Sequence, residues 1–227
     1  MYHGNLFEYV HLSPDKPLDL PYQLRLACDI AKGCAFMHNL TPPVLHRDLK
    51  SPNVLIASLS ENDEIVAKVA DFGTSQAVVS KTKGRTVANP VWLAPEIMKD
   101  EPYSEKADIY SFGVILWELC TRKQFFSEIS FMSALEQKVI EGERPGIPST
   151  CLAEYKTLIE NCWSGDPYQR PSFSECVRCL GSILKAVYPH LYEVAISEKP
   201  IAQGISEKVK VRCLLIFLFL FGSLPYF

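Results

Sequence analysis

The pattern of apolar and polar residues predicts a mostly helical chain. Apolar positions recur every three to four residues over residues 20–38, which indicates an amphipathic helix. The prolines of Thr41-Pro42-Pro43 end that helix. Later stretches repeat the same spacing, and the first of them is apolar on most sides, as expected of a helix in the middle of a domain. These helices are expected at residues 105–120, 130–141, 152–163 and 172–187.

Between the expected helices at 20–38 and 105–120, the chain carries apolar runs short enough for strands. The runs lie at residues 44–45, 54–56 and 66–69, and the polar turn 58–64 separates the last two, which predicts a β-hairpin. Residues 71–96 show little periodicity, and so long an irregular segment inside a compact domain is usually functional. The predicted fold class is therefore α+β, mainly α, with a small β-hairpin element.

Composition places the chain among soluble globular proteins, with 227 residues of which 48% are hydrophobic and 22% charged. The net charge of −3 gives no basic excess for binding nucleic acid. The eight cysteines do not show the paired spacing of a zinc site or a disulfide framework. The N-terminus lacks the charged-then-apolar order of a signal peptide. We therefore expect a reducing, cytoplasmic setting.

Charge and amide groups are concentrated in the string HRDLKSPN, residues 46–53. Within it, Asp48 and Asn53 are five residues apart, and Asp71 opens the string DFG just after the predicted hairpin. Carboxylate and amide oxygens suit Mg²⁺, which also binds substrate phosphates. Lys50 adds a compact positive charge suited to phosphate oxygen. This combination is what phosphoryl transfer needs, because that reaction depends mainly on positioning and charge stabilisation.

The order HRDLKSPN, DFG and then Ala94-Pro95-Glu96 resembles the large, C-terminal lobe of the eukaryotic protein kinases. The resemblance covers residues 1 to about 187. The strings HRDLKSPNVLI, VWLAPEI and DIYSFGVILWEL are similar to the tyrosine-kinase-like group, the serine/threonine kinases related to Raf and the mixed-lineage kinases. Lys50, two residues after Asp48, also favours serine/threonine specificity. The resemblance thus implies an enzyme that uses ATP and Mg²⁺ on a protein substrate.

The resemblance implies a role for each residue of the charged strings. Asp48 would be the catalytic base, Lys50 would contact the transferred phosphate, and Asn53 and Asp71 would hold Mg²⁺. For the nucleotide, the match places Asn5 near the ribose and Leu55 beneath the adenine. Met1 falls where backbone between the two kinase lobes would meet the adenine.

Other residues resemble the family's supporting parts. His46 and Phe72, the latter followed by Gly73, resemble the packed pair that couples the catalytic loop to the metal loop. Asp108 resembles the buried acid that accepts backbone N–H groups of the catalytic loop.

Arg170 resembles the partner of Glu96. A buried Arg–carboxylate pair of this kind can be bidentate, and the loss of one partner costs about 3–5 kcal/mol.

The predicted activation segment, which runs between DFG and Ala94-Pro95-Glu96, departs from the family pattern at one point and contains one candidate regulatory feature. Ala88-Asn89 stands where the family usually has Gly-Thr, so Asn89 would have to supply the threonine's hydrogen bonds, and dual specificity stays open. Arg47 resembles the arginine that captures a phosphorylated loop, and Thr82 and Thr86 are hydroxyls within residues 74–88 that an upstream kinase would modify. The alternative is a polar loop with incidental hydroxyls.

The domain organisation is predicted from the extent of the resemblance. Residues 1–187 are expected to form the C-terminal kinase lobe, and the small β-rich N-terminal lobe, with its Gly-rich loop, has no counterpart in the sequence. We therefore expect weak turnover or none from this chain alone. The alternative function is a catalytically silent, pseudokinase-like binding module.

Residues 188–227 lie beyond the kinase pattern and contain the apolar run 213–221, preceded by Lys208, Lys210 and Arg212. A basic flank before an apolar run suggests a membrane anchor. The 15 residues from 213 to 227 would span about 22 Å as a helix, short of the roughly 30 Å of bilayer hydrocarbon. Membrane attachment is therefore the less favoured interpretation.

Overall fold

The helix α4 (Lys106–Thr121) lies at the centre of the fold, and every residue from Ala107 to Leu119 is buried. The computed structural model describes residues 3–77, 82–85 and 89–196. By its contacts the chain divides into two units, 1–195 and 196–227, and all the described residues except Ile196 belong to the first unit. The predictions for Met1, Thr86, Ala88 and residues 213–227 fall outside the described residues.

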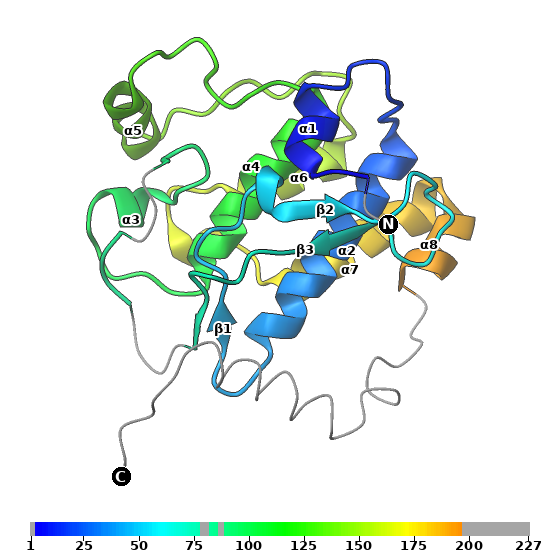
Figure 1. Cartoon of the computed structure of the whole chain (residues 1–227), viewed down its shortest axis with the longest axis horizontal. Coiled ribbons are helices and arrows are strands. Elements are labelled where there is room, and N and C mark those ends of the chain that lie inside the picture. Colours follow the sequence, from blue (N-terminus) through cyan, green and yellow to red (C-terminus); the bar gives the residue numbers. More distant parts are fainter. Residues whose placement is uncertain (1–2, 78–81, 86–88, 197–227) are drawn as a thin grey trace. The chain divides into compact units, whose positions relative to one another are not determined.

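Figure 1 shows α4 in the middle of the helices; it packs against α6 and α2, and α2 and α7 run side by side. In chain order, the other helices are α1 (Leu6–His11), α2 (Leu20–His38), α3 (Pro95–Met98), α5 (Met132–Ile140), α6 (Ala153–Cys162), α7 (Phe173–Val187) and α8 (Pro189–Ile196). The predicted helices agree with α2, α4, α5, α6 and α7 to within one or two residues. The short helices α3 and α8 were not predicted from the sequence.

The strands of the described residues form two antiparallel two-stranded sheets. The predicted hairpin pairs β2 (Val54–Ile56) with β3 (Ala67–Val69), and Val54 faces Val69. The second sheet pairs β1 (Val44–Leu45) with β4 (Gln76–Ala77). The expectation of irregular backbone throughout 71–96 is therefore wrong in two places, because β4 lies inside this range and α3 begins at Pro95. The predicted fold class, α+β and mainly helical, is confirmed.

The loop of the β2–β3 hairpin is fixed to α2 by a buried arginine. Arg25 has no exposed surface, and its guanidinium donates to the backbone carbonyls of Glu61, Asp63 and Glu64. Next along the helix, Asp29 accepts the backbone N–H groups at the start of β3, and burial raises the pKa of this carboxyl. The hairpin that carries Asn53 at one end and Asp71 at the other is thus held on the helical core.

Within the described part of the chain, no helix is long and apolar enough to cross a membrane. Every cysteine among the described residues is a free thiol, and Cys213 lies outside them.

Candidate active site

The catalytic loop between β1 and β2 brings together the side chains of Asp48, Lys50 and Asn53. The Nζ atom of Lys50 lies 2.7 Å from Oδ2 of Asp48. The Asn53 amide donates to the backbone carbonyl of Asp48 at 2.8 Å and to Oδ2 of the same residue at 3.1 Å. A short 3-10 turn, η1 (Ser51–Asn53), produces this return of the chain, and Pro52 is well tolerated in its first turn. The carboxylate of Asp48 is therefore fixed by two donors.

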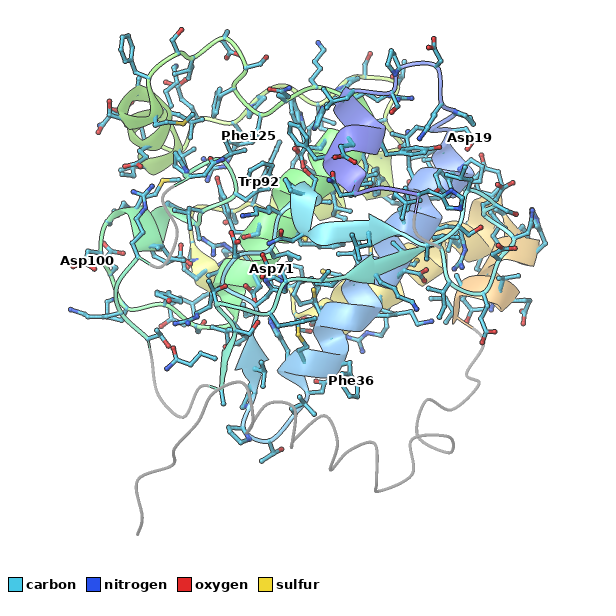
Figure 2. The ribbon with its side chains drawn as sticks, viewed as in Figure 1. Asp19, Phe36, Asp71, Trp92, Asp100 and Phe125 are labelled. Carbon is cyan, nitrogen blue, oxygen red and sulfur yellow. The ribbon has the colours of Figure 1, made fainter. Side chains whose placement is uncertain are left out.

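The metal loop after β3 is tied to the catalytic loop immediately before Asp71. The Ala70 backbone N–H donates to the Asn53 carbonyl at 2.8 Å, and His46 Nε2 donates to the Ala70 carbonyl at 3.0 Å. Figure 2 shows Asp71 at the end of β3, where its backbone adopts a left-handed conformation with φ of 61°. This conformation is unfavourable for a residue other than glycine, and such strain is found mainly at functional sites.

Phe72 and Gly73 complete the metal loop. The Phe72 ring lies 5.3 Å from the His46 ring, so the pair predicted to couple the two loops is in contact, although Phe72 keeps 41% of its surface exposed. The Gly73 N–H donates to Oδ1 of Asp71 at 3.3 Å.

Asp108 on α4 receives the backbone of the catalytic loop. Its carboxylate accepts the N–H groups of His46 at 2.8 Å and Arg47 at 2.9 Å. It also accepts Nε2 of His38 at 2.9 Å, a contact that sequence spacing did not suggest. Burial raises the pKa of Asp108, but hydrogen bonding and charge from His38, with help from His46, outweigh it and hold the pKa below its usual value. These bonds stabilise the left-handed backbone of Arg47, whose φ is 65°.

Replacing Asp108 with asparagine is expected to lower the free energy of unfolding by roughly 2–4 kcal/mol at neutral pH, because a buried acceptor of charge-assisted bonds is lost. Since the folded-state pKa is depressed, the contribution is present above the unfolded pKa of about 3.9 and is lost as the pH falls through the lower folded value. Urea unfolding of the wild type and the variant between about pH 3 and pH 7 measures this pH-dependent contribution to the free energy of unfolding. The neighbouring Glu105→Gln serves as control, and equal effects of the two substitutions would contradict the assignment.

The candidate nucleotide residues are only partly available. The Asn5 side-chain oxygen accepts the Glu8 N–H at 2.9 Å as the N-cap of α1, so only its amide NH₂ remains for a ribose hydroxyl. Leu55 lies on β2 with part of its side chain accessible, and its backbone pairs with Asn5 on one side and Lys68 on the other.

Asn89 lines a small notch together with Asp48, Trp92 and Leu93. Its side-chain oxygen accepts the Val91 N–H at 3.0 Å. The carbonyl that would have replaced the family's threonine as an acceptor is therefore engaged, and the amide NH₂ remains as a donor.

Glu96 and Arg170 form the predicted bidentate pair, with N–O distances of 2.7 and 2.8 Å. The Arg170 side chain is fully buried and also donates to the backbone carbonyls of Ser164 and Lys106. Its guanidinium lies 5.2 Å from the centre of the Tyr110 ring. The pair fixes α3 to the segment before α7.

A buried network beside the site was missed by sequence analysis. Glu118 on α4 accepts Nε1–H of Trp92 and Nε2–H of His11, each at 3.1 Å. Figure 2 shows Trp92 next to α4. This network joins α1 to the segment that precedes α3, and no spacing rule relates residues 107 positions apart.

The residues present fit a magnesium ion. Both donors of the Asn53 amide group are directed at Asp48, so its Oδ1 is left as a ligand, and Asp71 presents an exposed carboxylate. No group of three or more His, Cys, Asp or Glu side chains among the described residues is placed to hold a metal alone. An ion here would depend on water and phosphate oxygens for its other ligands, as Mg²⁺ does in nucleotide sites.

The described fold is α-rich with two small sheets, as in a protein kinase catalytic domain that lacks a full N-terminal lobe. The family model for protein tyrosine and serine/threonine kinases matches residues 1–180, and the chain belongs to this family. Within it, the chain is 50% identical over 191 residues to the probable serine/threonine-protein kinase pats1 of Dictyostelium discoideum. It is also 48% identical over 169 residues to the probable serine/threonine-protein kinase roco8 of the same organism. Serine/threonine-protein kinase CTR1 of Arabidopsis thaliana is 37% identical over 189 residues.

These matches cover most of this chain but little of the relatives. They take in 84%, 73% and 82% of the chain, and 6%, 9% and 22% of the respective relatives. The chain therefore corresponds to one part of much longer proteins.

Proposed function

We propose that this domain transfers the terminal phosphate of ATP to serine or threonine hydroxyls of a protein substrate. The observation that carries the proposal is the Asp48 carboxylate, held by Lys50 and Asn53 beside the loop that presents Asp71. An acid in contact with a cation, with metal-binding side chains on two loops that are bonded to each other through Ala70 and Asn53, matches the needs of phosphoryl transfer.

In this proposal, Asp48 accepts a hydrogen bond from the substrate hydroxyl and orients it toward the phosphorus. As the new O–P bond forms and the bond to the leaving ADP oxygen breaks, the hydroxyl proton passes to Asp48. Lys50, whose Nζ lies 2.7 Å from Oδ2 of Asp48, provides positive charge for the transferred phosphoryl group. Asn53 and Asp71 would hold Mg²⁺, which supplies charge neutralisation at the phosphates.

Serine/threonine specificity is supported by Lys50 and by the three relatives given above, which are described as serine/threonine-protein kinases or probable ones. The partners implied are ATP, a protein substrate and an upstream kinase acting on residues 74–88.

The direct test is magnesium-dependent nucleotide binding. Asp71→Asn is expected to weaken the binding of Mg²⁺·ATP at least about tenfold, because one anionic ligand is lost. Calorimetry with ATP measures the affinity in the presence and absence of Mg²⁺. Asp100→Asn is a matched control, since Asp100 is also exposed and also has a positive φ, 54°.

Wild-type chain that bound no nucleotide would contradict the proposed function and favour a binding module. Affinity that did not respond to Mg²⁺, or was equal in the two variants, would contradict the metal assignment. Phosphoryl transfer by the chain alone is expected to be slow, since several parts of the kinase site are not encoded in these residues.

A further inference from the structure

The guanidinium of Arg47 is engaged by the segment that follows the metal loop. Its Nε donates to the Thr74 carbonyl and its Nη1 to the side-chain oxygen of Gln76, both at 2.5 Å. Both acceptors are uncharged, and hydrogen bonds from a charged donor are stronger than neutral ones. Arg47 therefore has partners supplied by the chain itself, within three residues of the metal loop.

The same segment is joined to the catalytic loop at several neighbouring points. Gln76 pairs with Leu45 across the β1–β4 sheet. The hydroxyls of Thr74 and Ser75 donate to the His46 carbonyl at 3.1 and 3.4 Å. Each of these bonds is weak by itself, and β4 has only two residues, so the strand has little intrinsic stability.

Among Thr74, Ser75 and Gln76, it is the Gln76 side chain that accepts a hydrogen bond from the Arg47 guanidinium. Arg47 is in turn fixed by its own backbone, because its N–H donates to the buried Asp108. A continuous path of bonds thus runs from the helical core through Arg47 to the segment directly after Asp71-Phe72-Gly73.

We propose that Gln76 is a positioning residue: its side-chain oxygen holds the Arg47 guanidinium and so orders residues 71–77 against the catalytic loop without a phosphate. The effect on nucleotide binding rests on the function proposed above, whereas the ordering itself does not. A phosphate on the activation segment would then compete with Gln76 for Arg47 and would not be required for the order of this segment.

Amide hydrogen exchange of phosphatase-treated protein tests the ordering. Gln76→Ala is expected to raise the exchange rates of the amides of residues 72–77 about tenfold. Gln76→Glu keeps the acceptor oxygen and is expected to retain wild-type protection at low ionic strength. In about 1 M salt the Gln76→Glu variant is expected to lose part of that protection by screening, while the wild-type protein does not. Gln169→Ala, at another exposed glutamine, is the matched control.

Three results would overturn the proposal. They are unchanged exchange in Gln76→Ala, failure of Gln76→Glu to restore protection at low salt, and wild-type protein that is protected only when phosphorylated. Titration with Mg²⁺·ATP separates this question from the proposed function. If the wild-type protein does not bind Mg²⁺·ATP, the proposed function is contradicted, and the role of Gln76 is then decided by the hydrogen-exchange rates alone. If the wild type binds, Gln76→Ala is expected to bind about tenfold more weakly and Gln76→Glu like the wild type.

Discussion

Arg170→Met is expected to lower the free energy of unfolding by about 3–5 kcal/mol, because it leaves the Glu96 carboxylate buried without its cation. The free energy of unfolding of a small domain is only about 5–15 kcal/mol in total, so much of the variant should be unfolded near physiological temperature. The substitution also removes the donors to the carbonyls of Ser164 and Lys106.

Urea unfolding followed by circular dichroism gives the free energy of unfolding for this comparison. Arg178→Met is the matched control, since the Arg178 side chain is 76% exposed and lies 3.8 Å from Glu175, and a loss below about 0.5 kcal/mol is expected. A double variant with Glu96→Leu should recover part of the stability, because no buried charge is then left unpaired. A loss below about 1 kcal/mol for Arg170→Met would show that the pair does not anchor α3.

Asp48→Asn is expected to slow phosphoryl transfer by about 10²–10⁴-fold while changing the affinity for Mg²⁺·ATP little. The amide keeps the shape of the carboxylate and one acceptor for Lys50, but it cannot take the proton of a substrate hydroxyl. Single-turnover assays with labelled ATP and a protein or peptide acceptor measure the rate, and calorimetry measures the affinity.

The control for this comparison is Asp15→Asn, at an exposed aspartate in the loop after α1. Transfer at the wild-type rate by Asp48→Asn would exclude Asp48 as the base. An equal loss of rate and of nucleotide affinity would instead make Asp48 a binding residue.

The parts of the fold that depend on local pattern were predictable from the sequence. The run of apolar residues that predicted a buried helix at 105–120 is α4, and the polar turn at 58–64 does separate two paired strands. The charged string also predicted a cluster around Asp48, because the residues involved are at most five positions apart.

Contacts between distant segments were not predictable by the same reasoning. β4 has two residues and depends on β1 for its hydrogen bonds, so it leaves no periodic signal. His38 reads as one more residue of an amphipathic helix, and only the packing of α2 against α4 brings it to Asp108. His11, Trp92 and Glu118 come from three segments, and no single segment indicates that they meet.

The clamp of Arg25 on the hairpin loop has a consequence for how this region can vary. The guanidinium binds main-chain oxygens of residues 61, 63 and 64, so the side chains at those positions are not what it recognises. Substitutions at these positions would leave the main-chain acceptors of the clamp in place, whereas an added or deleted residue would move the carbonyls away from a cation that has no access to water. The length of this turn, more than its composition, is therefore the quantity under constraint.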